Sequence, residues 1–196
     1  MRRAFLRGLF AAEGGIGIVN KENYIAYVAY HLSYEKEEKL ANLVQKLLVL
    51  ENVTSKQIIR KNKGERYLQI TGWQNYYNCW KIGLFNLCVR KKKKFLEKVR
   101  KTKFFFKLKK QFISKLLNTL ELSHRQIGLA LGITPYTLCV LNKNKTSYIN
   151  KNNLLKLAKF NNISLEQIKE HIVSLRVNRS THINDLSFID YILKNP

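Results

Sequence analysis

The chain has 196 residues, enough for one large domain or two small ones, and 45% of them are hydrophobic, which is sufficient for packed cores. Thirty-six basic residues against 13 acidic ones give a formal net charge of +23 and a pI near 10.1. A charge of this size excludes most ordinary enzymes of small metabolites and indicates a polyanionic partner, nucleic acid first and an acidic membrane surface second.

The cysteines and the chain start exclude several other classes. No CxxC pair and no histidine at zinc spacing accompanies the three cysteines, so we expect reduced, mostly buried thiols at Cys79, Cys88 and Cys139. The apolar run after Met1 is interrupted by Arg7 and ends in an acid, unlike a targeting peptide, and no stretch reaches transmembrane length. We expect an intracellular protein of the cytoplasm, the nucleoid or an organelle matrix, with no membrane partner.

The opening segment predicts a helix over 4–13 that stops at the glycine pair 14–15. Glu13 then lies at the helix C-terminus, where the macrodipole disfavours an anion by about 0.3 to 1 kcal/mol. A cation beside Glu13 would explain its place. Gly8 and Ala12 share one helix face and form a smooth strip that a second backbone could approach closely.

Residues 15–85 predict a mixed helix and strand unit. Apolar periodicity and turn residues indicate a strand over 15–20, a longer strand over 24–34 and a helix over 35–50. They then indicate a hairpin of two strands, over 55–62 and 66–71, and a helix over 75–85. With the opening helix this is an αββαββα order. Such a unit is α+β, with helices on one face of an antiparallel sheet and the other face open.

The last predicted strand indicates what the open face carries. Leu68 and Ile70 would point to the helices, whereas the side chains of Tyr67, Gln69 and Thr71 would point outward. The flanking cations are Arg60, Lys61, Lys63 and Arg66. Such a surface suits DNA; a merely solvated sheet face is the alternative.

The strongest charge lies in residues 90–115, which hold 13 basic residues and one acid and so about half of the net charge. Five consecutive cations open this segment, and we expect two of them, Arg90 and Lys92, to contact DNA phosphates. A solvated helix face or a disordered tail is the alternative, although the interleaved apolar residues Phe95, Leu96 and Val99 argue against disorder.

A second module follows. Ser123 is placed to cap a helix that runs to Leu131, and Gly132 indicates a turn after it. Thr134 as the cap, with Pro135 at the first helical position, predicts the start of another helix that runs to about Leu141. Two more helices are expected over 153–160 and 164–172. Helix, glycine-centred turn and helix is the geometry that sets a recognition helix into the major groove.

Residues 122–134 (LSHRQIGLALGIT), with 154–159 and 163–168, resemble the Cro/repressor-like helix-turn-helix family over about 112–172. Gly128 stands where that family usually has alanine. The resemblance implies base contacts from Tyr136, Thr137 and Val140, and contacts nearer the DNA backbone from Thr134, Asn142, Lys143 and Lys145. An unrelated small helical bundle is the alternative.

The opening residues also resemble the motif of the LAGLIDADG homing endonucleases, at Leu6, Gly8, Leu9, Ala12, Glu13 and Gly14. The resemblance extends over about 4–103 and includes the element order. In that family two units pack their motif helices on a two-fold or pseudo-two-fold axis, where their acids hold divalent metals between protein and double-stranded DNA.

The resemblance implies roles for particular residues. Glu13 would bind Mg²⁺ directly, Ala12 would offer its carbonyl oxygen, and Gly8 with Ala12 would form the helix contact. The metals would activate water and stabilise the leaving 3′-oxygen during phosphodiester hydrolysis. Lys91 is the best match to the basic residue beside the scissile phosphate, and Ser33 or Tyr34 would help to order water.

Two departures from that family bear on assembly. Ala11 stands where many members have a first acid, and the chain contains one motif and begins almost directly on it. We therefore expect either a homodimer that reads a near-palindromic site or the second half of a longer two-motif protein.

These observations give the following expectations. Residues 1–103 form the LAGLIDADG endonuclease-like domain, 104–115 a basic linker and 116–172 a small all-α helix-turn-helix domain, with 173–196 unassigned apart from a short helix over 186–193. The function is a site-specific DNA endonuclease that makes a Mg²⁺-dependent double-strand break, with the helix-turn-helix adding affinity or specificity. The alternatives are a non-cleaving transcriptional regulator or an intron-splicing maturase on the same scaffold, and an anionic-membrane binder.

Overall fold

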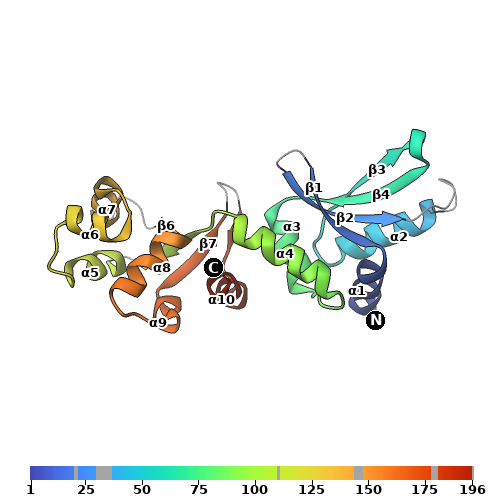
Figure 1. Ribbon diagram of the computed structural model, residues 1–196. Helices are drawn as coiled ribbons and strands as arrows, with labels where there is room; N and C mark the ends of the chain where they lie inside the picture. Colours follow the sequence, from blue (N-terminus) through green and yellow to red (C-terminus); the bar gives the residue numbers. More distant parts are fainter. Residues whose placement is uncertain (20–21, 30–36, 110, 144–147, 178–180, 196) are drawn as a thin grey trace. The chain divides into compact units, whose positions relative to one another are not determined.

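The computed structural model describes residues 1–19, 22–29, 37–109, 111–143, 148–177 and 181–195. The chain divides into two compact units, Met1–Arg100 and Lys101–Pro196, each drawn in Figure 1. Both contain helices and an antiparallel sheet. This agrees with the α+β class expected for the first unit and differs from the all-α class expected for the second. No helix within the described ranges is long and apolar enough to cross a membrane.

The first unit has the predicted order of elements. They are α1 (Arg2–Ala12), β1 (Gly14–Val19), β2 (Glu22–Ala29), α2 (Glu38–Val49), β3 (Lys56–Arg60), the short 3₁₀ turn η1 (Lys61–Lys63), β4 (Glu65–Ile70), α3 (Trp73–Lys81) and α4 (Val89–Lys101). The four strands pair in the order β1-β2-β4-β3, all antiparallel. Helices α1 and α2 lie on one side of this sheet (Figure 1).

Strand β4 separates the two faces of the first sheet. Arg66, Leu68 and Ile70 are buried, whereas the alternate residues Tyr67 and Gln69 are half-buried. The buried side chains of α1 and α2 supply the other half of this core, with Leu6, Phe10, Ala41, Val44 and Leu48. The prediction that Leu68 and Ile70 face the helices agrees with this burial.

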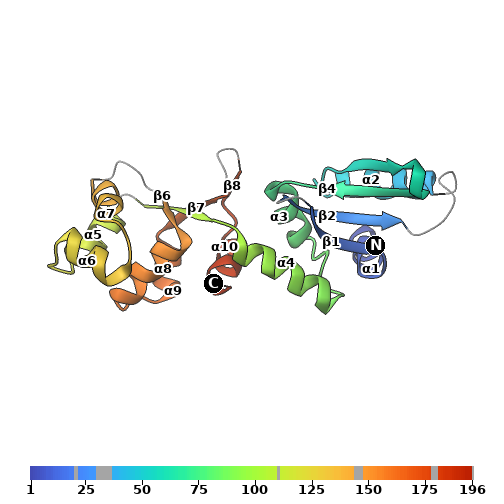
Figure 2. The ribbon, with the colours of Figure 1, turned by 45° about the horizontal axis from the view of Figure 1, so that its top comes forward.

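The second unit combines a second sheet with a group of helices. Its elements are β5 (Phe105–Leu108), α5 (Phe112–Asn118), α6 (His124–Leu131), α7 (Pro135–Asn142), β6 (Tyr148–Asn150), α8 (Lys151–Phe160), α9 (Leu165–Glu170), β7 (Ile172–Arg176), β8 (His182–Ile183) and α10 (Leu186–Lys194). The strands pair in the order β6-β5-β7-β8. In Figure 2, α5, α6 and α7 gather at one end of this unit and the strands lie at the other.

This second sheet differs from the sequence expectation. The segment 104–115, expected as a basic linker, contains β5 and the start of α5, and 173–196 contains β8, α10 and most of β7. The unit is therefore mixed rather than all-α. The sequence did not reveal the strands because β5 has only four residues, one of them Lys107, and because its partners β6 and β7 lie far away along the chain.

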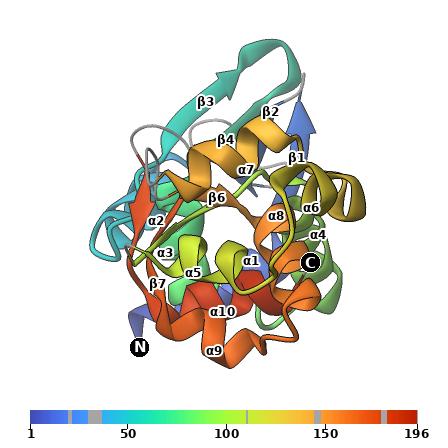
Figure 3. The same ribbon diagram turned by 90° about the vertical axis from the view of Figure 1, so that its left-hand side faces the viewer.

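The α6–α7 pair is built as its caps predict. Figure 3 shows α6 and α7, which follow one another along the chain. The Ser123 side chain caps α6 in a reciprocal capping box with Gln126, Gly132 ends the helix in the left-handed region, and the Thr134 hydroxyl caps α7. Gly128 has a packing role: a Cβ there would lie 2.6 Å from the carbonyl oxygen of Ile133. Glycine at this place lets the turn approach α6.

Candidate functional site

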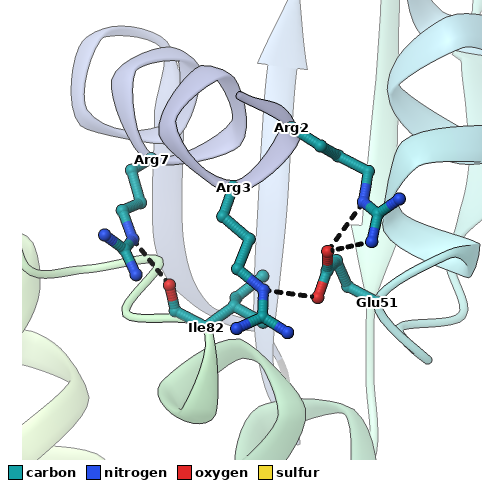
Figure 4. A network of polar contacts seen from close by, with 5 residues as sticks. All are labelled: Arg2, Arg3, Arg7, Glu51 and Ile82. Carbon is teal, nitrogen blue, oxygen red and sulfur yellow. Dashed lines mark hydrogen bonds and ion pairs between the residues drawn. The ribbon is translucent and has the colours of Figure 1, made fainter.

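Two contacts fix the first half of α1 (Figure 4). Arg2 and Arg3 donate to the two carboxylate oxygens of Glu51 at 2.7 and 2.8 Å. Burial would raise the pKa of the Glu51 carboxyl, but the hydrogen bonds from the two arginines outweigh it and hold that pKa below its usual value. One turn further along, Arg7 donates to the carbonyl oxygen of Ile82 at 2.7 Å. Helix α1 is thus tied both to the end of α2 and to the segment after α3.

Lys91 of α4 fixes the other end of α1. Its ammonium donates to the carbonyl oxygens of Phe10 and Ala11, both at 2.6 Å, and lies 3.4 Å from that of Ala12. These carbonyls belong to the last turn of α1, where a cation complements the helix dipole. Burial lowers the pKa of Lys91, and the charge of Glu13 partly opposes that effect. Lys91 is the cation expected near Glu13.

Glu13 forms the C-cap of α1, and its backbone N–H donates to the carbonyl of Leu9 at 2.8 Å. Its side-chain oxygen Oε2 is buried and has no hydrogen-bond partner among the described residues. The chain turns sharply here, since a Cβ at Gly14 would lie 2.7 Å from the carbonyl oxygen of Phe10. The backbone of Glu13 is therefore fixed where α1 passes into β1, and its Oε2 is buried there.

These groups fit a hard divalent cation. A buried carboxylate oxygen without a donor costs about 1 to 3 kcal/mol or more, and a bound cation would remove that cost. Carboxylate and carbonyl oxygens are the ligands that Mg²⁺ prefers. Among the described residues, no three or more His, Cys, Asp or Glu side chains gather into a larger metal cluster.

The predicted helix-contact strip lies on the surface of the first unit. Gly8 and Ala12 are exposed, and Phe5, one turn before Gly8 on the same face, is 43% exposed. A Cβ at Gly8 would meet no atom within 4 Å. We call Phe5, Gly8 and Ala12 the α1 strip; it is flat, apolar and accessible.

The residues predicted to face outward from the first sheet, and the cations beside them, are exposed or half-buried, except for one arginine. Tyr67 and Gln69 are half-buried, Thr71 is exposed, and the Arg60 guanidinium lies 5.1 Å from the centre of the Tyr67 ring. Lys61 and Lys63 are exposed in the turn η1.

Arg66 is the exception, since it is 4% exposed on the helix-covered face. There it donates to Gln57 Oε1 at 2.8 Å and lies 3.7 Å from Glu38. The two-residue period of a strand puts Arg66 with Leu68 and Ile70, so we omit it from the surface proposed below.

The basic residues of α4 fall into two groups, exposed and buried. Arg90 and Lys92 are exposed, as a phosphate contact requires, but Lys91 and Lys98 are buried. The Lys98 ammonium lies 4.0 Å from the centre of the Tyr76 ring, and burial lowers its pKa to about 8. Sequence reasoning missed Lys98, although the spacing of Lys91, Phe95 and Lys98 puts the three on one helix face.

In the second unit, Tyr136 is 79% exposed and Lys143 is exposed, while Val140 is half-buried. The hydroxyls of Thr134 and Thr137 lie 2.7 Å apart at the start of α7. Lys145, expected nearer the DNA backbone, lies outside the described residues. So do Ser33 and Tyr34 of the first unit, which were expected to help order water.

Comparison with known protein families gives a match for part of the first unit. No curated protein and no solved structure matches the chain. Residues 1–81 match the family model described as a LAGLIDADG-like domain. The match begins before α1 and ends at the last residue of α3, so the first unit is similar to LAGLIDADG-like domains through both pairs of strands and the end of α1 that bears Glu13.

Proposed function

We propose that the protein is a site-specific DNA endonuclease that hydrolyses a phosphodiester bond in each strand with Mg²⁺. The observation that carries this function is the buried, unpaired Oε2 of Glu13 at the end of α1, in a segment similar to a LAGLIDADG-like domain. A carboxylate held in that way is suited to a cation rather than to a structural hydrogen bond.

Glu13 and the carbonyl oxygen of Ala12 would hold the metal, which when bound supplies an activated water and neutralises charge on the leaving 3′-oxygen. The chain's own residues set that geometry. Lys91 ties down the carbonyls of Phe10 and Ala11, so the last turn of α1 cannot fray. Its buried charge also stands near Glu13, where it balances the anion before metal and DNA arrive.

A second copy of the chain would complete the site. The α1 strip offers small residues along which another α1 could pack closely, and each chain contributes one Glu13. A two-fold axis through that contact would place the two carboxylates near each other and predicts a near-palindromic target. A LAGLIDADG-like partner unit on a longer protein would serve the same purpose.

Two surfaces would hold the duplex. In the first unit the open sheet face and α4 offer Arg60, Lys61, Lys63, Tyr67, Gln69, Thr71, Arg90 and Lys92. In the second unit α7 would act as the recognition helix of a helix-turn-helix, with Tyr136, Thr137 and Val140 toward the bases and Thr134 and Lys143 toward the backbone. The cap hydrogen bonds at Thr134 fix the angle at which α7 is presented.

The experiment starts from the purified full-length chain and a pool of randomised duplex DNA. Sequences retained in the absence of divalent metal are recovered, and their cleavage is then measured with Mg²⁺. Glu13→Gln should abolish cutting while leaving binding to the same duplex intact. Glu97→Gln removes an exposed acid of α4 and should cut as the wild type does. Cleavage by Glu13→Gln at the wild-type rate would rule out the metal-ligand role.

A non-cleaving regulator or a splicing maturase is the second candidate, and the α6–α7 pair is what favours it. A protein that needs only to bind would keep that pair and the basic surface without a working Glu13. Tight binding of selected duplexes with no cutting under Mg²⁺ or Mn²⁺ would identify this class.

A further inference from the structure

The two faces of the second sheet differ in chemistry. One face carries a continuous apolar row across all four strands, in which paired residues are at most 3% exposed: Phe106, Ile149, Leu175 and Ile183. Helices α8 and α10 contribute their own fully buried side chains to the same unit, among them Leu154, Leu157, Phe188 and Ile192. This face is core.

The opposite face carries rings and cations. Strand pairing places Asn150, Phe105, Arg176 and His182 in one row across the sheet, and puts Tyr148 opposite Lys107 in the next. These side chains are half-buried, and His182 is exposed. None of the four strands contains an acidic residue.

The flat groups on this face are already stacked on one another. The Arg176 guanidinium lies 4.0 Å from the centre of the Tyr148 ring and 5.5 Å from that of Phe105. The Tyr148 hydroxyl lies 3.5 Å from Nδ1 of His182. Side chains from all four strands thus form one preorganised layer, which we call the aromatic sheet face and define as Phe105, Lys107, Tyr148, Arg176 and His182.

We propose that the aromatic sheet face binds unpaired nucleotides of a single-stranded nucleic acid. Bases stack on aromatic rings and on guanidinium planes, and every base has a π-face to offer. Duplex bases are already stacked on their neighbours, so rings lying on a sheet reach only bases that are unpaired. The site is separate from Glu13 and does not depend on cleavage.

Charge agrees with a polyanionic strand. Residues 101–196 contain 16 basic and five acidic residues, a net charge of +11. On the face itself, Lys107 and Arg176 are placed to neutralise phosphates while Tyr148 and Phe105 contact bases. A neutral or cationic ligand would gain nothing from these positive charges.

The first test measures binding of the full-length chain to fluorescent oligothymidylate DNA and oligouridylate RNA by polarisation at fixed salt. Tyr148→Ala should weaken binding about tenfold, the loss of roughly one stacked base. Arg176→Lys keeps the positive charge but removes the planar guanidinium, and should also weaken binding. Tyr148→Phe keeps the ring, and Lys115→Gln removes a positive charge from the exposed surface of α5; both should bind as the wild type does. The ratio of the affinities for the DNA and RNA strands shows whether the face prefers deoxyribose or ribose.

Three results would overturn the assignment: no binding of either strand by the wild type, unchanged binding by Tyr148→Ala, or an equal loss of duplex affinity in that variant. A second measurement needs no variant. Strands containing iodouracil are photocrosslinked to the wild-type chain, and the modified peptides are identified by mass spectrometry. Crosslinks at Tyr148 or Phe105 support the site, whereas crosslinks confined to other residues exclude it.

Discussion

The ammonium of Lys91 lies 2.6 Å from the carbonyl oxygen of Ala11, two residues before Glu13. This contact joins α4 to the end of α1, so the helix that carries the longest cationic run also positions the candidate metal ligand. It explains how an acid can be tolerated at a helix C-terminus, because the same end holds a buried positive charge.

Lys91→Met should destabilise the first unit by about 1 to 3 kcal/mol, since it removes the charged donor that bonds to the carbonyls of Phe10 and Ala11. Urea unfolding followed by tryptophan fluorescence reports on this unit, because Trp73 and Trp80 both lie in α3. Lys94→Met, exposed on the same helix, is the charge-matched control and should unfold as the wild type does. Equal stability of the two variants would show that the cap contributes nothing.

The first unit could be predicted almost completely from sequence, because its elements are long enough to show their period and are bounded by turn residues. The macrodipole argument at Glu13 also predicted a nearby cation. Which residue supplies that cation was not predicted, since the burial of Lys91 on α4 depends on how that helix packs. Arg66 differs, because the two-residue period that places Leu68 and Ile70 on the helix side also places Arg66 there; its basic neighbours in the hairpin led to the wrong assignment.

The second sheet could not be predicted, because its strands are short and pair over long separations. β6 has three residues and β8 two. Strands of that length have too few residues for alternation to be recognised, and only their pairing with β5 and β7 defines them. The helices between them carry caps, and these local signals were sufficient to locate α6 and α7.

Gly8→Leu should weaken self-association without lowering the stability of the monomer. Nothing lies within 4 Å of a Cβ at Gly8, so the chain itself has room, whereas a second α1 could no longer approach closely. Sedimentation velocity over a concentration series measures the effect. Lys46→Leu adds the same side chain to an exposed position of α2 and should leave the association unchanged. Unchanged association of Gly8→Leu would place the interface elsewhere, and tighter association would show that the two helices do not need a close approach at Gly8.

Lys98 predicts a pH dependence. Its pKa of about 8 in the folded protein is below the ordinary value of 10.5, so between those pH values the unfolded chain binds the proton more strongly. Stability therefore rises with pH across this window, as deprotonation removes the cost of a buried charge.

The stability of the wild type relative to Lys98→Met should accordingly increase by about 1 to 3 kcal/mol from pH 8 to 10.5. Urea midpoints at several pH values, again by tryptophan fluorescence, give that difference. Lys93→Met is exposed and should show no such trend relative to the wild type. A flat difference for Lys98→Met would mean that the ammonium is solvated and that its contact with Tyr76 is not a buried one.

Gly128→Ala tests the packing of the turn between α6 and α7. Alanine in a helix interior usually gains about 0.5 to 1 kcal/mol over glycine. Here its Cβ would lie 2.6 Å from the carbonyl oxygen of Ile133, and overpacking of this kind costs about 1 to 3 kcal/mol. Gly128→Ala should therefore destabilise the second unit instead of stabilising it. Hydrogen–deuterium exchange of α6 and α7 peptides reports the change locally, because the second unit contains no tryptophan. Gly8→Ala, where the surroundings are open, is the matched control and should be stabilising. If both alanines slow exchange in their own helices, the turn adjusts at no cost and Gly128 is not required for the approach of α7.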